Sequence, residues 1–474
     1  MSETSSKWQS NVYALIFHTI EPRILMIPGT EVWSLPSFQF DLRLRFGDDS
    51  LILPELQDTL GLERTNATVL RCAHIHYVDE GDHHQVDMIY IMESNNPAWV
   101  PPAEMQWIGR EALESLPLTL PQQREVIATC LHEIETHSIP PLRPPWERRG
   151  WFSTAAAWIQ AQLAQSGYTV VAPIEQVRIW GISCILRVPT TTGTVYFKAS
   201  PVQIADESRR LPFLFANEAA LTRGLAGLFP EHIPTPLAID PARGWMLLED
   251  FGQKLREHPV LAAWEEALQI FSRLQVASSK HVELLLATGC LDRRLDKLPG
   301  QIDLLMNDTQ ISSFLDKAEV EQLQAYTPLF KAMCDQLASY NIPATLVHGD
   351  LHPGNIALGQ GKPVFFDWTD GCVSHPFFDA ITFWEEVDRL GDTPDARSRL
   401  RDIYLEQWTA YEPMERLLEA AVLAERLGML HQAVSYQHIT ANMEAPWDKS
   451  IGSGLTFWLR VLLKSMTEPE LRAT

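Results

Sequence analysis

Several features that would assign the chain to a common class are missing from its 474 residues. Its six cysteines are scattered and form no CxxC pair, so the sequence predicts neither a zinc framework nor a disulfide scaffold. No apolar run reaches the roughly 18 residues that a membrane-spanning helix needs. Residues 1–10 are polar and lack the apolar segment of a secretory signal, so we expect a cytoplasmic protein.

Positive charge is also scarce. The chain has 38 Lys and Arg against 60 Asp and Glu, which gives a formal net charge of −22. This balance disfavours nucleic acid and anionic membranes as partners and suits a neutral or cationic small-molecule substrate. The length indicates two or three domains, and the oligomeric state stays open.

The N-terminal third has the pattern of short strands with few helices. Residues 12–17 and 24–27 are expected to form one hairpin, and residues 69–78 and 86–92 a second. Residues 121–135 have helical periodicity. This part is therefore expected to be a small domain of its own, ending near residue 136.

Four prolines in residues 137–150 mark the best domain boundary. Proline removes a backbone donor and favours extended structure, so we expect a semi-rigid linker. From about residue 341, short strands surround a polar loop, and the rest is helical. Between these segments we expect a helix at residues 151–165 and a second helix at 215–228. We expect strand-like stretches at 177–188, 194–199 and 245–249.

The strongest chemical signal is the sequence HGDLHPGN, followed by an apolar strand and Asp367. Phosphoryl transfer needs a carboxylate beside the attacking hydroxyl and oxygen ligands that hold Mg²⁺ on the phosphates. Asp350 and Asn355 are five residues apart, as in kinase catalytic loops, and Asn355 with Asp367 offers the oxygens that Mg²⁺ prefers. The alternative is a polar turn in which His348 and His352 only satisfy backbone groups.

Lys198 lies inside an apolar strand, where an unpaired charge is costly. The expected partner is Glu218 on the following helix, with Glu207 as a second candidate. In kinases such a pair directs the lysine toward the α- and β-phosphates. Alternatively, Lys198 lies at an edge and extends to water.

Residues 178–184 are expected to form the hairpin that covers the phosphates. This segment has one glycine, Gly181, where protein kinases have three. Its backbone amides and the hydroxyl of Ser183 remain candidates for phosphate contact.

Three motifs resemble those of the aminoglycoside phosphotransferase and choline kinase-like superfamily: HGDLHPGN at 348–355, FFDW at 365–368 and YFKA at 196–199. The resemblance covers about residues 151–474. It implies an α+β, bilobal protein-kinase-like fold with a small lobe at 151–250, a helical large lobe at 251–474, and ATP or GTP between them.

By matching position, the resemblance implies that Asp350 is the catalytic base and that Asn355 and Asp367 are Mg²⁺ ligands. It also implies that Lys198 and Glu218 position the phosphates.

The same resemblance places the nucleobase at a hinge, residues 248–251, which includes Glu249 and Phe251. Members of the superfamily phosphorylate antibiotics, choline, sugars and amino-acid derivatives, so the acceptor stays open. A cationic, aminoglycoside-like acceptor would suit four acidic residues, Asp370, Glu385, Glu386 and Asp388. The last three could equally form a solvated helix face.

Residues 1–136 more loosely resemble a Nudix domain, an α/β/α fold. The sequence WSLP at 33–36 matches the lead into a Nudix box, and residues 104–108 resemble the strand that closes such domains.

The box itself is damaged. Residues 37–38 replace a glycine pair, and Thr59 replaces a carboxylate, while Glu55 and Asp58 are kept in kind. Pro54 is expected to begin the helix and so to shorten it. Two carboxylates hold a pyrophosphate-bound metal poorly, so we expect a non-catalytic domain.

The leading hypothesis is therefore a nucleotide- and Mg²⁺-dependent kinase that phosphorylates a hydroxyl group of a small molecule. The second is a nucleotide- or metabolite-binding sensor, a pseudokinase, which would not need Lys198, Asp350, Asn355 and Asp367 together. The third is a Nudix-type pyrophosphohydrolase, against which the damaged box argues.

Overall fold

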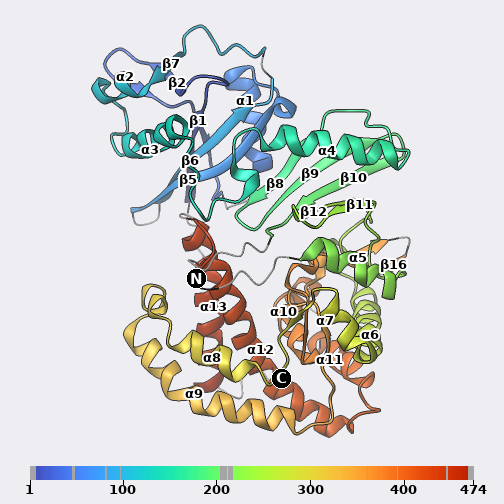
Figure 1. Ribbon diagram of the computed structural model, residues 1–474. Coiled ribbons are helices and arrows are strands. Elements are labelled where there is room, and N and C mark those ends of the chain that lie inside the picture. The colour runs from blue at the N-terminus through green and yellow to red at the C-terminus, as the bar shows by residue number, and fades with distance from the viewer. Residues whose placement is uncertain are drawn as a thin grey trace. The chain divides into compact units, whose positions relative to one another are not determined.

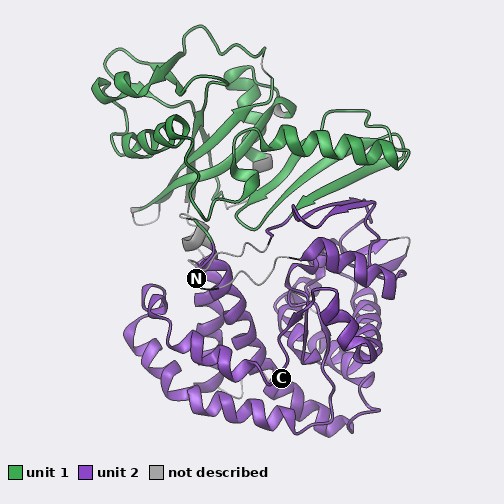
Figure 2. Cartoon of the chain, viewed as in Figure 1, with its two compact units in different colours: residues 1–199, 443–450 green, residues 200–442, 451–474 purple. Residues whose placement is uncertain are grey.

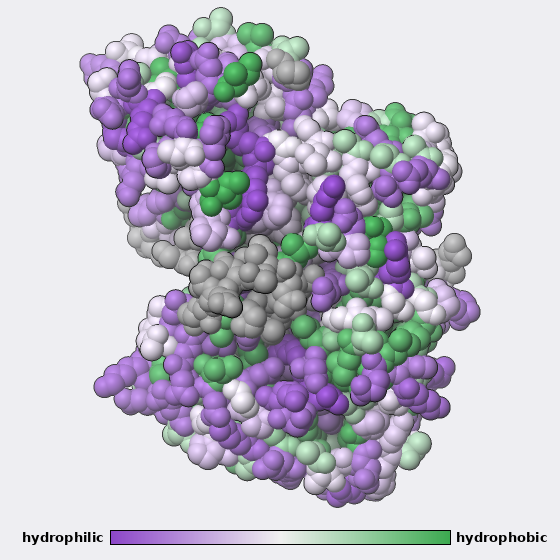
Figure 3. Space-filling model, in the orientation of Figure 1, coloured by the Kyte–Doolittle hydropathy of each residue, from purple (hydrophilic) through white to green (hydrophobic). Residues whose placement is uncertain are grey.

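The computed structural model describes residues 7–44, 49–80, 83–96, 98–202, 211, 217–359, 361–391, 393–444 and 447–467. The chain forms two compact units (Figure 2). Unit 1 is Met1–Ala199 with Met443–Ser450, and unit 2 is Ser200–Asn442 with Ile451–Thr474. Within the described ranges, no helix is both long and apolar enough to cross a bilayer. Hydrophilic residues cover most of the visible face of each unit (Figure 3).

The N-terminal part of unit 1 contains two small sheets and the helices that pack on them (Figure 1). One sheet has the order β4-β1-β6-β5, in which β1 is parallel to β6, and the other has the order β3-β2-β7. The strands are β1 (Lys7–Ile16), β2 (Arg23–Pro28), β3 (Trp33–Ser34), β4 (Ser37–Phe40), β5 (Ala67–Glu80), β6 (His83–Ser94) and β7 (Gln106–Gly109). The helices are α1 (Asp49–Leu60), α2 (Arg110–Ser115) and α3 (Gln123–Thr136).

Of the two predicted hairpins, one is confirmed and one is wrong. The hairpin of residues 69–78 with 86–92 is confirmed, because β5 and β6 pair antiparallel along their length. The hairpin of residues 12–17 with 24–27 is wrong. A turn is present, but after the single bridge between Phe17 and Ile24 the strands β1 and β2 enter different sheets.

Helix α1 begins at Asp49, so the prediction that Pro54 starts this helix is wrong. Proline inside a helix removes one hydrogen bond. Here Ile52, Leu53 and Leu56, on both sides of it, are fully buried. The burial of this face outweighs the lost bond and extends the helix upstream of the proline.

The proline-rich segment is packed against the rest of unit 1. Trp146 is buried, and its Nε1 donates to the carbonyl oxygen of Trp180 at 2.8 Å. The side chain of Gln176 makes two 2.9 Å hydrogen bonds with the backbone of Val69. These contacts join the N-terminal part to the strands that follow the segment. The domain boundaries at 136, 150 and 250 stay predictions.

Behind this segment lie α4 (Trp151–Gln165), β8 (Glu175–Trp180), β9 (Ser183–Thr190) and β10 (Gly193–Ala199). The strands are antiparallel, and α4 packs on them through contacts of Trp151 and Trp158 with the ring of Phe197. The helix expected at 151–165 and the strands expected at 177–188 and 194–199 are confirmed.

Unit 2 is mostly helical around one large apolar core. Its strands are β11 (Ala238–Asp240), β12 (Trp245–Glu249), β13 (Leu291–Asp292), β14 (Thr345–Val347), β15 (Ile356–Gly359), β16 (Lys362–Phe365) and β17 (Cys372–Ser374). Its helices are α5 (Glu218–Leu228), α6 (Leu261–Ser278), α7 (Val282–Ala287), α8 (Leu298–Met306), α9 (Lys317–Ala338), α10 (Ala380–Trp384), α11 (Ala396–Glu406), α12 (Met414–Thr440) and α13 (Trp447–Thr467). The mixed α/β content and the helical C-terminal region agree with the predicted fold class.

Candidate active site

The motif HGDLHPGN forms a loop between a buried strand and a hairpin. All of β14 is buried, and the chain leaves this strand at His348. After the loop, β15 and β16 pair antiparallel. The N–H of Phe366 donates to the carbonyl oxygen of Asn355 at 3.1 Å, which ties the loop to the segment that carries Asp367.

His348 is a structural part of this loop. Its side chain is fully buried, its Nε2 donates to the carbonyl oxygen of Phe366 at 2.9 Å, and its Nδ1 accepts the N–H of Asp350 at 3.3 Å. Burial lowers the pKa of His348 below its usual value, so the ring is neutral near pH 7. Both ring nitrogens therefore bind backbone groups, the N–H of Asp350 and the carbonyl oxygen of Phe366.

A buried carboxylate that the sequence analysis did not identify holds the same loop. Asp379 ends the short helix η8 (Pro376–Asp379) and is fully buried. Its two oxygens accept the N–H groups of His348 and Gly349, each at 2.8 Å, and the Nε2 of Gln275 at 2.9 Å. Burial raises the pKa of Asp379 to about 7, although these hydrogen bonds lower it. The hydroxyl of Tyr404 donates to Gln275 at 2.6 Å and completes the network.

Gly349 has a backbone conformation that a side chain would not tolerate. Its φ is +83°, and a Cβ atom there would lie 2.5 Å from the carbonyl oxygen of Asp370. Its own carbonyl oxygen accepts the side-chain amide of Gln432 on α12. Glycine at this position is what allows Asp350 to follow a buried strand and still reach solvent.

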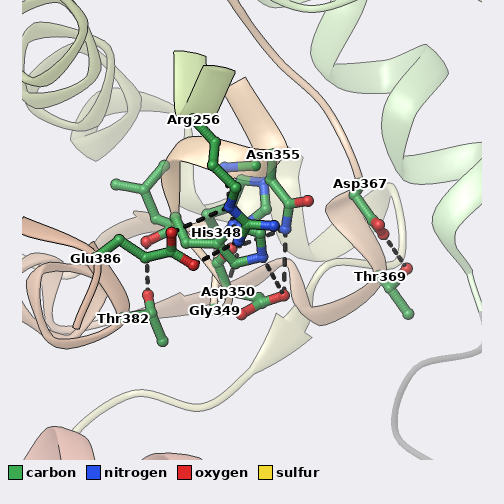
Figure 4. A network of polar contacts seen from close by, with 12 residues as sticks. Arg256, His348, Gly349, Asp350, Asn355, Asp367, Thr369, Thr382 and Glu386 are labelled. Atoms are coloured by element: carbon green, nitrogen blue, oxygen red, sulfur yellow. Dashed lines mark hydrogen bonds and ion pairs between the residues drawn. The ribbon is translucent and has the colours of Figure 1, made fainter. Parts of the chain in front are cut away.

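Asp350 is the accessible acid of the loop, with a side chain that is 43% exposed. The Nδ2 of Asn355 donates to its carbonyl oxygen at 3.0 Å and to its Oδ2 at 3.2 Å (Figure 4). The Nε2 of His352 lies 3.5 Å from the same Oδ2. The carboxylate is thus held on one side and open on the other.

An ion pair orients His352. The guanidinium of Arg256, in the short helix η3 (Leu255–Glu257), donates to His352 Nδ1 at 2.9 Å. It also makes two bonds to Glu386, at 2.6 and 3.0 Å (Figure 4). The N–H of Gly354 also donates to His352 Nδ1, at 2.9 Å. With Nδ1 accepting, the proton of a neutral His352 is on Nε2, which faces Asp350.

The acidic residues expected to bind a cationic acceptor do not form one set. Glu386 is only 16% exposed and is neutralised by Arg256 and Arg389. Glu385 and Asp388 are exposed. For these three residues the structure therefore favours the solvated face and the ion pair over an ammonium site. The fourth candidate, Asp370, packs directly against Gly349.

Asn355 and Asp367 suit the donor chemistry of a Mg²⁺ site. The Nδ2 of Asn355 faces Asp350, so its amide oxygen is turned away from that residue and is available as a ligand. Asp367 adopts left-handed backbone angles, φ 66° and ψ 58°, and its Oδ1 accepts the hydroxyl of Thr369 at 2.8 Å. Such angles are costly for a non-glycine residue and are typical of functional sites.

The side chains of the described residues do not form a complete metal site by themselves. The part of the chain that the structure describes holds no group of three or more His, Cys, Asp or Glu side chains able to bind a metal ion. The two oxygens of Asn355 and Asp367 are instead the small set that Mg²⁺ uses when phosphate and water supply the other ligands.

The predicted phosphate-positioning residues lie on the expected elements. Lys198 is on β10, in unit 1, with a half-buried side chain. Glu218 is the first residue of α5, in unit 2, is 2% exposed and accepts the hydroxyl of Ser200 at 2.6 Å. Their pairing stays a prediction, and Glu207 lies outside the described residues.

The remaining predicted nucleotide contacts are in two other segments. Ser183 follows the turn between β8 and β9, is buried, and accepts the Nε1 of Trp180 at 2.5 Å. Glu249 is exposed at the end of β12. Two residues later, the ring of Phe251 lies 4.7 Å from that of Phe366, next to the Asp367 segment.

Comparison with known families agrees with these motifs. Residues 194–417 match the model of the phosphotransferase enzyme family. The matched range includes Lys198, Asp350, Asn355 and Asp367. No curated protein matches the chain.

The solved structures that are similar to this chain include kinases of small molecules. A choline/ethanolamine kinase family protein from Mesorhizobium loti has 16% identity and a TM-score of 0.46, covering 66% of this chain and 95% of its own. The choline kinase LicA of Streptococcus pneumoniae has 11% identity and a TM-score of 0.45, covering 66% and 99%. An aminoglycoside phosphotransferase of Streptomyces rimosus has 18% identity and a TM-score of 0.35, covering 59% and 98%.

Proposed function

We propose that this protein is a small-molecule kinase that transfers the γ-phosphoryl group of a nucleoside triphosphate to a hydroxyl group. The acceptor oxygen forms a bond to the γ-phosphorus while the bond from that phosphorus to the β–γ bridging oxygen breaks. The acceptor proton passes to the carboxylate of Asp350, and the nucleoside diphosphate leaves.

The strongest support for this proposal is the way in which Asp350 is held. Asp350 is an accessible carboxylate on a loop. Two backbone N–H groups of this loop donate to the buried carboxylate of Asp379, which fixes the backbone. Its own oxygen is further held by Asn355, so its position is set before any substrate binds. A group that receives a proton during transfer must be positioned in this way.

The other residues have proposed roles in holding the nucleotide. Asn355 and Asp367 would hold Mg²⁺, which neutralises charge on the phosphates when bound. Lys198, supported by Glu218, would contact the phosphates, with Ser183 as a further donor. Backbone groups near Glu249 and Phe251 would bind the base.

The acceptor class is tested by a phosphorylation screen with the full chain. The panel contains aminoglycosides, macrolides, choline, other amino alcohols and sugars, each with ATP and with GTP in the presence of Mg²⁺. Release of nucleoside diphosphate that depends on one acceptor supports the proposal and names the substrate. Mg²⁺-dependent nucleotide binding without transfer to any acceptor would favour the nucleotide sensor instead.

Replacing Asp367 by Ala is expected to weaken Mg²⁺-dependent nucleotide binding by at least about tenfold. Groups that only support a metal ligand already contribute about 10–100-fold to metal affinity, and a ligand should contribute no less. Isothermal titration of nucleotide with and without Mg²⁺ measures the effect. Asp402→Ala, which removes an exposed carboxylate of α11, is the control. An Asp367→Ala protein whose nucleotide affinity still rises fully with Mg²⁺ would rule out the assigned role.

The N-terminal part is expected not to hydrolyse nucleoside diphosphate derivatives. Glu55 and Asp58 lie one turn apart on α1, and Thr59 occupies the neighbouring position where a further carboxylate would be needed. Assays of the full chain with dinucleotides and nucleotide sugars, in Mg²⁺ and in Mn²⁺, should show no product above background. Turnover that disappears in Glu55→Gln would establish an active hydrolase and contradict this expectation.

A further inference from the structure

Three side chains connect in series to the carboxylate of Asp350: Glu386, Arg256 and His352 (Figure 4). Arg256 makes two bonds to Glu386, and its Nη2 also donates to Nδ1 of His352 at 2.9 Å. A partly exposed ion pair contributes little free energy by itself and needs no third contact. The bond from Arg256 to the ring therefore indicates that the pair does more than hold two segments together.

The contacts of His352 place its ring proton on the side of Asp350. Nδ1 receives two donors, Nη2 of Arg256 and the backbone N–H of Gly354, each at 2.9 Å. Neither donor can accept a hydrogen bond, so Nδ1 carries no proton and the N–H of the ring is on Nε2. Nε2 lies 3.5 Å from Oδ2 of Asp350. Hydrogen bonds of catalytic groups are often long before substrate binds and shorten in the complex.

The two oxygens of Asp350 therefore have different surroundings. Oδ2 faces two donors, Nδ2 of Asn355 at 3.2 Å and Nε2 of His352 at 3.5 Å. Among the described residues, no group donates to Oδ1 of Asp350. Donors beside a carboxylate oxygen stabilise its charged form, so a proton binds more readily to the oxygen without them. Oδ1 is thus the oxygen left to meet the acceptor hydroxyl.

Arg256 and Glu386 both lie on segments that are fixed to the reactive loop. Three residues before Arg256, the carbonyl oxygen of Gln253 accepts the N–H of Leu358 in β15 at 2.8 Å. Glu386 lies shortly after α10, and the residue before α10 is Asp379, whose carboxylate binds the loop backbone. One segment is therefore tied to the beginning of the loop and the other to the strand that follows it. The ion pair that joins these segments has a fixed position relative to His352.

We propose that the ion pair of Arg256 and Glu386 positions His352 for phosphoryl transfer. Held in this way, the Nε2–H of His352 fixes Oδ2 of Asp350, and Oδ1 receives the proton of the acceptor hydroxyl. This proposal rests on the kinase function proposed above. Arg256 and Glu386 are positioning residues, since they act on the reaction only through His352. Without them the ring can turn, the carboxylate can turn with it, and small errors in its position slow transfer strongly.

A double-mutant cycle in the full chain tests whether Arg256 acts through His352. Arg256→Met keeps the length of the side chain and removes its donors, while His352→Phe keeps a ring and removes its nitrogens. Each change is expected to lower kcat about tenfold, because a displacement of about 1 Å can cost 10²-fold. The double variant is expected to lose no more than the more damaging single change. Losses that multiply would show two independent roles and overturn the proposal.

Two further measurements separate positioning from a general structural effect. Nucleotide affinity, titrated with Mg²⁺, is expected to be unchanged in Arg256→Met, so that only kcat falls. A matching loss of nucleotide affinity would place Arg256 at the nucleotide and overturn the proposal. His352→Gln keeps an amide that can donate to Asp350 and is expected to retain more activity than His352→Phe. Equal losses in these two variants would show that the donor on Nε2 is not what matters.

The matched control is Arg389→Met, because Arg389 also binds Glu386 but makes no contact with His352 in the described structure. It should have the kcat of the unmodified chain. Thermal unfolding of each variant checks that it is folded. If Arg256→Met is unstable, Glu386→Gln, which removes the other member of the pair, takes its place in the cycle.

Asp350→Asn is assayed beside these variants, because it separates failure of this proposal from failure of the proposed function. A strong loss in Asp350→Asn with full kcat in Arg256→Met would overturn the positioning role and leave the kinase function standing. No loss in Asp350→Asn would overturn both. Nitrogen NMR of protein with labelled histidines tests the series without turnover. The signals of His352, identified by their loss in His352→Gln, should show a protonated Nε2 and an unprotonated Nδ1. The opposite tautomer would overturn the proposal.

Discussion

Replacing Asp350 by Asn is expected to lower phosphoryl transfer by about 10²–10⁴-fold, the usual contribution of a general base. The amide has the same shape as the carboxylate, and its oxygen can still accept the Nδ2 of Asn355, which now lies 3.2 Å from Asp350 Oδ2. It cannot take up the acceptor proton. Because the loop is held through the backbone by Asp379, its geometry should survive the change.

The readout separates binding from chemistry. Nucleotide affinity, measured by titration with Mg²⁺, should be unchanged, while kcat falls for the acceptor found by the screen. The slow hydrolysis of nucleotide, with water in place of the acceptor, gives a second measure that needs no known acceptor. Asp303→Asn, which removes one carboxylate of α8 in the same unit, should leave both values as they are. Transfer within a few-fold of the unmodified chain would exclude Asp350 as the base.

The reactive loop was predictable because its chemistry is local in the chain. Asp350 and Asn355 are five residues apart, and the buried strand before them and the hairpin after them can be read from short apolar runs. The family match over residues 194–417 agrees with this part of the prediction.

The support of the loop was not predictable, because it comes from distant positions. Gln275 and Asp379 are over a hundred residues apart in sequence and meet only when α6 and η8 pack together. Arg256 and Glu386 are separated by a similar distance. Each is an ordinary polar residue in its own segment, and no spacing pattern marks it. Such contacts follow from tertiary packing, on which a single sequence carries little information.

The N-terminal errors have the same origin. The turn after β1 was visible, but β1 takes β4 and β6 as its neighbours, so the local hairpin loses to pairings that are distant in the chain. Pro54 has a strong local preference for a helix start, and the burial of Ile52 and Leu53 overrides it. In both cases strand pairing or side-chain burial outweighs the local preference of the chain.

Asp379→Asn is expected to reduce turnover by tenfold or more without a direct contact to substrate. The carboxylate accepts three N–H donors, from His348, Gly349 and Gln275, and an amide has only one oxygen to offer. A buried N–H group left without an acceptor costs about 1–3 kcal/mol, so the loop is expected to shift to avoid it. A shift of about 1 Å at Asp350 is enough to slow transfer strongly.

A positioning role has a signature in the pH dependence of stability. Burial raises the pKa of Asp379 to about 7, above the value of about 3.9 expected in the unfolded chain. Below about pH 4 the carboxyl is protonated in both states. As the pH rises toward 7, the unfolded chain releases this proton first, so the stability that Asp379 contributes is progressively lost and is gone above about pH 7. The Asn variant has no proton to release.

The assignment is tested by measuring the midpoint of thermal unfolding and kcat of both proteins at pH 5, 6, 7 and 8. The advantage of the unmodified chain over Asp379→Asn should shrink between pH 5 and 7 and then stay constant, and kcat of the variant should be low throughout. Asp335→Asn, an exposed change on α9, controls for the loss of one carboxylate. A difference in stability that is independent of pH would show that Asp379 is ionised at all these values. A variant with normal kcat would show that the hydrogen bonds to His348 and Gly349 do not position Asp350.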